Sequence, residues 1–118
     1  MFTLTIQVQQ ADLDVMNHVN NVIYLRYAQE VAEAHWHAKG TADMHAKFSW
    51  VVLRHEIDYH VPSLLNHELV GRTWVEPPHG PKVIRHVELF NTTLQKVTAK
   101  VKTTWCLLDA TTFRPRGI

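Results

Sequence analysis

The spacing of hydrophobic residues along this chain changes its period twice. From Thr3 to Val8 apolar and polar residues alternate, which predicts a short strand. From about Val19 to Ala38 the apolar residues recur every three or four positions, which predicts an amphipathic helix about 30 Å long. Gly40 follows its last turn and is a natural stop. The buried face of this helix is expected to carry Tyr24, Tyr27, Ala28, Val31, Ala34 and His35.

After a polar connection over residues 41–47, the pattern returns to the alternation typical of strands. Pro62 ends the first of these strands, and a proline-rich turn over residues 77–81 separates the second from the third. The expected strands are 51–61, 68–76, 82–90 and 95–108. In the first of them, one face is expected to carry Val51, Leu53, Ile57, Tyr59 and Val61.

This order of elements predicts the fold class. Short links between strands favour antiparallel neighbours, and a single helix can cover only one face of a five-stranded sheet. We therefore expect an α+β fold in one domain over residues 1–118, with a curved antiparallel sheet wrapped around one long helix. The uncovered face of that sheet is expected to hold an apolar patch that needs a partner, made of Trp50, Val52, Val70 and Trp74.

Composition and charge exclude several classes of function. The chain has 118 residues, a net charge of +1 and scattered lysines and arginines, which argues against binding to nucleic acid or to an anionic membrane. The sequence shows neither a secretion signal nor a membrane-spanning run, so a cytoplasmic protein is expected. Cys106 is the only cysteine, which excludes an intrachain disulfide and fits a reducing compartment.

The segment Asp12–Asn21, DLDVMNHVNN, carries the most chemistry. It places two acids, a histidine and three asparagines directly before the predicted helix. A helix start offers unpaired backbone N–H groups and the positive end of the helix dipole. Those donors can stabilise an oxyanion while a nearby carboxylate activates water or attacks a carbonyl, so the segment is a candidate site for acyl transfer.

The same segment resembles a known family. Residues 13–21, LDVMNHVNN, are close to the LDVNQHVNN segment of plant acyl-ACP thioesterases, and the order of elements resembles the hotdog-fold thioesterases of the 4-hydroxybenzoyl-CoA thioesterase-like type. Trp105 through Asp109, followed by Arg114 and Pro115, resembles their closing strand and tail. The resemblance covers the whole chain and implies hydrolysis of an acyl-CoA or acyl-carrier-protein thioester without a metal or redox cofactor.

The resemblance also implies residue roles. Asp14 matches the catalytic carboxylate, His18 matches the histidine of the plant motif, and the backbone N–H of Asn21 would polarise the thioester carbonyl. Met16 departs from the motif, which has asparagine there. The family usually forms homodimers with two sites at the interface, often paired into homotetramers. Candidate substrate contacts are Asn17, Asn20 and Tyr24 near the helix start, with Lys82 and Arg85 where relatives contact coenzyme A phosphates.

Other interpretations of these residues remain open at this point. Asp12 is expected to act as a turn or capping residue, and Cys106, within an apolar run, as a small buried hydrophobe rather than a nucleophile. The nine histidines show no metal-ligand spacing. A hotdog hydratase or dehydratase is one alternative, although that class usually has five steps and a proline between acid and histidine, against four steps here. A non-catalytic acyl-binding domain is another.

Overall fold

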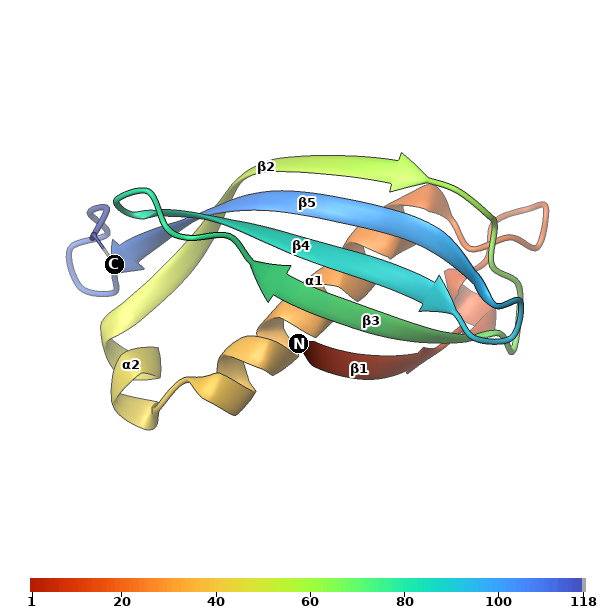
Figure 1. Ribbon diagram of the computed structural model, residues 1–118, viewed down its shortest axis with the longest axis horizontal. Helices are drawn as coiled ribbons and strands as arrows, with labels where there is room; N and C mark the ends of the chain where they lie inside the picture. Colours follow the sequence, from red (N-terminus) through yellow and green to blue (C-terminus); the bar gives the residue numbers. More distant parts are fainter. Residues whose placement is uncertain (118) are drawn as a thin grey trace.

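The computed structural model describes residues 1–117, so Ile118 lies outside the described residues. All five strands form one antiparallel sheet, in the order β1-β3-β4-β5-β2, that curves over a long helix (Figure 1). This confirms the predicted α+β architecture. In chain order the elements are β1 (Phe2–Gln7), a 3-10 turn η1 (Gln10–Asp12), α1 (Asn21–Lys39), α2 (Ala42–Lys47), β2 (Phe48–Tyr59), β3 (Glu68–Val75), β4 (Lys82–Asn91) and β5 (Lys96–Asp109).

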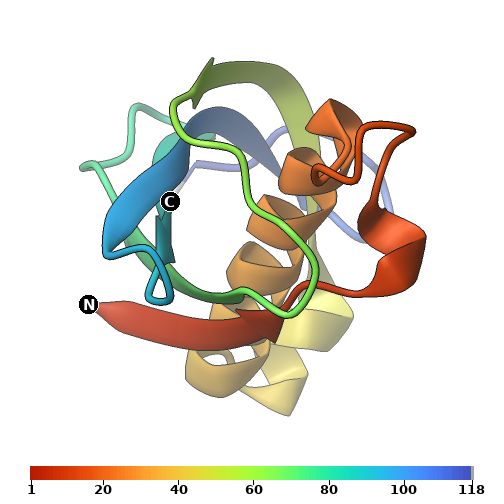
Figure 2. The same ribbon diagram turned by 90° about the vertical axis from the view of Figure 1, so that its right-hand side faces the viewer.

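The core lies between α1 and the concave face of the sheet, as the view along the molecule shows (Figure 2). The predicted apolar face of the helix is largely confirmed, because Tyr24, Tyr27, Ala28 and Val31 are buried. Ala32, which the sequence did not place on that face, is buried as well. The small side chains of Ala28 and Ala32 let the sheet approach this part of α1 closely.

Gly71 of β3 marks the closest approach of sheet and helix. A Cβ atom at this position would lie 2.4 Å from Cγ2 of Val31, which is 0% exposed. We therefore expect Gly71→Ala to lower the free energy of unfolding by about 1–3 kcal/mol, the usual range for overpacking a core. Urea denaturation would measure the loss, and Val31→Ala in the same chain should recover part of it because the two sites share one space. A Gly71→Ala protein as stable as the wild type would contradict this packing.

Ala42–Lys47 form the short helix α2 within the segment 41–47, where a polar connection was expected. The hydroxyl of Thr41 accepts a hydrogen bond from the Met44 N–H at 3.1 Å, and Asp43 pairs with Lys47 one turn later. None of the residues of α2 is buried, so the segment has no apolar face. Helix prediction from hydrophobic period needs such a face, which is why the pattern indicated only a connection.

A β-bulge in β2 corrects the predicted faces of that strand. The register with β5 shifts between Val52 and Arg54, so the alternation of side chains reverses near Leu53. Trp50 and Val52 consequently face α1, together with Ile57 and Tyr59. The expected shared face of Val51, Leu53, Ile57 and Tyr59 was therefore wrong.

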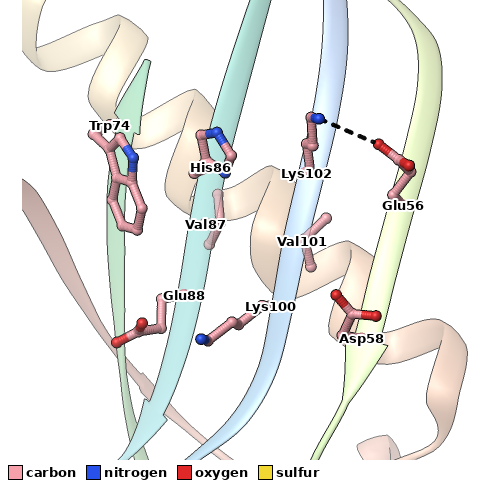
Figure 3. Close-up of a pocket in the computed structure, with 9 residues that line it drawn as sticks. All are labelled: Glu56, Asp58, Trp74, His86, Val87, Glu88, Lys100, Val101 and Lys102. Atoms are coloured by element: carbon pink, nitrogen blue, oxygen red, sulfur yellow. Dashed lines mark ion pairs between the residues drawn. The ribbon is translucent and has the colours of Figure 1, made fainter. Parts of the chain in front are cut away.

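The bulge also removes half of the expected apolar patch, because Trp50 and Val52 lie on the helix side of the sheet. The outer face instead carries mainly charged rows across the strands, such as the Lys102–Glu56 and Arg72–Glu88 pairs. A shallow hollow of about 380 Å³ lies there, with α1 behind the sheet (Figure 3). Trp74 stacks on His86 at its rim, with ring centroids 5.4 Å apart.

Candidate active site

The motif before α1 folds into a small hairpin. Asp14 and His18 face each other across it, because the N–H of Asp14 donates to the carbonyl of His18 at 2.8 Å. Leu13 forms a bridge with Val19, and the N–H of Asn20 donates to the carbonyl of Asp12 at 2.9 Å. The chain turns back at Val15, Met16 and Asn17, and Asn17 adopts a left-handed conformation with φ 60°. The predicted acid and histidine are thus brought together by local backbone bonds.

The carboxylate of Asp14 is held on one side and open on the other. Its Oδ1 accepts hydrogen bonds from the N–H groups of Met16 at 2.9 Å and His18 at 3.2 Å. Its Oδ2 and the imidazole of His18 form no hydrogen bonds within residues 1–117, and both side chains are half-buried. One oxygen therefore fixes the orientation of the carboxylate, and the other is available to a water molecule or a substrate carbonyl.

The helix start lies directly after this hairpin. Asn20 caps α1, because its side chain accepts a hydrogen bond from the Val22 N–H at 3.1 Å, while the Ile23 N–H donates to the Asn20 carbonyl. The backbone N–H of Asn21 has no hydrogen-bond partner among the described residues. Asn21 is exposed, so this donor can serve a ligand at the positive end of the helix dipole.

Asp12 anchors the hairpin to the helix rather than taking part in an open site. It is 2% exposed and accepts hydrogen bonds from Tyr27 at 2.5 Å, Arg26 at 2.6 Å and the N–H of Gln9 at 3.2 Å. Burial acts to raise the pKa of this carboxyl, but the three hydrogen bonds and the Arg26 charge outweigh it and lower the pKa. The same burial, together with Asp12, raises the pKa of Tyr27. The expected capping role of Asp12 is confirmed, and the carboxylate also forms an ion pair with Arg26, whose side chain is half exposed.

A buried serine that the sequence analysis missed supports the hairpin from the other side. The carbonyl of Ser63 accepts the Val19 N–H at 2.9 Å, and the Ser63 N–H donates to the hydroxyl of Tyr24 at 3.1 Å. Its own hydroxyl donates to Thr98 at 2.8 Å and accepts from Asn91 at 3.1 Å. Ser63 belongs to the connection from β2 to β3, which crosses the end of the fold where α1 begins (Figure 2).

The other predicted contacts are spread over the molecule. Asn17 is exposed at the hairpin tip, and Lys82 is exposed where β4 begins. Tyr24 is buried and its hydroxyl is bonded within the protein, so a substrate contact would have to come from its ring. Arg85 lies on the helix side of β4 and contacts His35 in the second half of α1, away from the hairpin.

An apolar hollow of about 570 Å³ opens between the second half of α1 and the sheet. Three charged residues lie in its lining, namely Arg85, Glu33 and Glu76. β2 begins at this end of the helix, beside α2 (Figure 1). The apolar walls of the hollow come from Trp36, Phe48, Trp50, Val75, Val83 and Trp105.

The described residues contain one buried thiol and no cluster of metal-ligating side chains. No three His, Cys, Asp or Glu side chains within residues 1–117 converge in a way that could hold a metal ion. Cys106 is buried in β5, and its thiol forms one hydrogen bond within residues 1–117, to the carbonyl of Leu107 at 3.8 Å. None of the helices within residues 1–117 is both long enough and apolar enough to span a bilayer.

Comparison with solved structures finds several proteins with the fold of this chain. The chain superposes on the probable thioesterase YbaW from Escherichia coli with a TM-score of 0.85 and 22% identity, covering 99% of this chain and 90% of that one. For the 1,4-dihydroxy-2-naphthoyl-CoA thioesterase Slr0204 from Synechocystis the TM-score is 0.87, with 16% identity and 99% and 88% coverage. For a thioesterase from Thermus thermophilus, solved with coenzyme A and Zn, the TM-score is 0.84 and the identity 22%. The match covers 98% of this chain and 84% of that one.

These structures share the hotdog fold with the present chain. No curated protein matches the chain in sequence. The sequence profile of the thioesterase-like superfamily does match, over residues 8–116, which is nearly the whole chain and includes the Asp14 hairpin. The chain therefore belongs to the thioesterase-like superfamily.

Proposed function

We propose that the protein hydrolyses an acyl thioester of coenzyme A or of an acyl-carrier protein to a free acid and a thiol. The observation that carries this proposal is the carboxylate of Asp14, with one oxygen fixed by two backbone N–H groups and the other free. It lies in the hairpin that leads into α1, whose first N–H group, that of Asn21, is unpaired within residues 1–117. Membership of the thioesterase-like superfamily supports the same reaction class.

In the proposed reaction the Asn21 N–H and the helix dipole stabilise the oxyanion that forms when the thioester carbonyl is attacked. One such donor typically contributes about 3–4 kcal/mol in the transition state. Asp14 either removes a proton from the attacking water or attacks the carbonyl itself to form an anhydride that water opens. The ring of His18 is free to bind the substrate or the water, and Lys82 would contact coenzyme A phosphates.

The acyl group needs a protected space, and we propose that a second copy of the chain completes it. β2 is an edge strand of twelve residues, none of them buried, although Trp50 and Ile57 are apolar. Long unpaired edges favour pairing with another strand. Tyr59 contacts the helix start through the Asn21 carbonyl, whereas Trp50 packs on Trp36 near the other end. Antiparallel pairing of two β2 strands would therefore bring the Asp14 hairpin of one copy to the apolar hollow of the other.

Release of thiol from a panel of acyl-CoA substrates tests the proposed function. The panel should contain short, medium, long and aromatic acyl groups, with the oligomeric state measured on the same sample by light scattering. We expect turnover of at least one class by an assembly no smaller than a dimer. Hydration of an enoyl-CoA without thiol release would instead identify a hydratase, and binding without any turnover would identify an acyl-binding domain.

A further inference from the structure

Arg85 is a charged residue in an apolar place. It projects from β4 toward α1 and lines the hollow whose walls include Trp36, Trp50 and Trp105. Its Nη1 donates to the hydroxyl of Thr73 at 2.9 Å and to Nδ1 of His35 at 2.9 Å. Burial lowers the pKa of Arg85, as expected for a cation removed from water.

No carboxylate compensates this charge within residues 1–117. Ion pairs within 4.0 Å are formed by four other arginines of the described residues: Arg26, Arg54, Arg72 and Arg116. Arg85 forms none, and of the two acids at the hollow, Glu76 is instead bonded to His86 at 2.6 Å. An uncompensated, partly buried cation is unfavourable, so a negatively polarised ligand group beside it would be stabilised strongly.

The guanidinium still has donors to offer. Both hydrogens of Nη1 are engaged by Thr73 and His35, whereas Nε and Nη2 have no partners among the described residues. These two nitrogens form the side of the guanidinium that presents a parallel pair of N–H groups. Such a pair matches the two oxygens of a carboxylate, and it can also donate hydrogen bonds to a single hydroxyl oxygen.

We infer that Arg85 selects acyl groups that carry an acceptor oxygen, foremost a carboxylate, at the end remote from the thioester. This inference rests on the proposed function and on its dimer. His35 lies fourteen residues beyond Asn21, about 21 Å along α1, which is too far for a short acyl group within one chain. In the proposed dimer the acyl group enters the hollow from the partner's hairpin, and its apolar body lies against the indole rings.

Matched pairs of substrates test the inference by thiol release. Three pairs differ in a terminal carboxylate, namely glutaryl- and pentanoyl-CoA, adipoyl- and hexanoyl-CoA, and suberoyl- and octanoyl-CoA. The fourth pair, 4-hydroxybenzoyl- and benzoyl-CoA, differs in a hydroxyl. We expect kcat/KM to favour the oxygen-bearing member by at least about tenfold in one pair, the effect of one hydrogen bond to a charged group. A preference confined to the fourth pair would identify the acceptor as a hydroxyl.

Two results would overturn the inference in distinguishable ways. Turnover of these substrates with ratios near one in every pair rejects selection by Arg85 but leaves the thioesterase proposal intact. Failure to hydrolyse any thioester rejects the proposed function itself, and the inference with it.

Variants assign the preference to Arg85. Arg85→Met should bring the ratio within the preferred pair close to one, and Arg85→Lys should keep part of it, because it keeps the charge but not the paired N–H groups. Arg72→Met is the matched control, since Arg72 lies on the outer face of β3 and pairs with Glu88. It should leave the ratio as in the wild type. An unchanged ratio in both Arg85 variants would contradict the assignment.

Discussion

Asp14→Asn should lower the rate of thioester hydrolysis at least about a hundredfold, the lower range for a positioned acid–base group. The fold should survive, because the amide oxygen of asparagine can still accept the N–H groups of Met16 and His18 that the carboxylate Oδ1 now binds. What disappears is the second, free oxygen as a base or nucleophile. Thiol release measures the rate, and urea denaturation of the same sample measures the stability.

Asp109 provides a matched control for this substitution. Its carboxylate also accepts two backbone N–H groups in a turn, those of Thr111 at 2.9 Å and Thr112 at 3.0 Å, but it lies at the end of β5. Asp109→Asn should therefore leave turnover nearly unchanged, and so should Cys106→Ser. Near-normal activity in Asp14→Asn would refute the assignment of the carboxylate, and inactivation by Cys106→Ser would revive a cysteine nucleophile.

The elements with a clear hydrophobic period could be predicted from the sequence to within a few residues. The long helix was expected over 19–38 and spans Asn21–Lys39, and the strand expected over 82–90 spans Lys82–Asn91. The bulge near Leu53 could not be predicted, because one inserted residue reverses every later face without changing the composition of the strand. The position of the bulge depends on the pairing of β2 with β5, and the hydrophobic period of one segment carries no information about that pairing.

The residues of the candidate site also fall into two groups, those that the sequence predicted and those that it did not. Asp14 and His18 are four residues apart, so their local spacing was sufficient to predict that they lie close together. Ser63 and Arg85 were beyond that reasoning, because their partners are distant in sequence: Ser63 bonds to Tyr24, 39 residues away, and Arg85 to His35, 50 residues away. Arg85 was expected to contact coenzyme A phosphates from its place beside a turn, but the alternation of β4 puts it on the helix side.

Asp12→Ala should lower the stability of the fold strongly, whereas Asp14→Asn should lower activity and leave the fold intact. The substitution leaves the buried hydroxyl of Tyr27 without its acceptor, and an unpaired buried group costs about 1–3 kcal/mol. It also removes the acceptor of the N–H of Gln9, which is an exposed residue. The pair with Arg26 adds less, because that side chain is half exposed. We expect the free energy of unfolding in urea to fall by about 2–3 kcal/mol. Glu30→Ala, which removes the other partner of Arg26 at the surface, should change it by less than about 0.5 kcal/mol.

The dependence of this loss on pH separates the charge of Asp12 from its packing. The pKa of Asp12 is lower in the folded chain than its ordinary value of 3.8, so its ionised form stabilises the fold above that value. The contribution disappears as the pH falls through the folded pKa, because protonation then removes the charge. Asp12→Asn keeps an acceptor for Tyr27 but has no charge at any pH. The stability difference between wild type and Asp12→Asn should therefore be constant near neutrality and begin to narrow below about pH 3.8, and a difference that grew in acid would contradict the role of the charge.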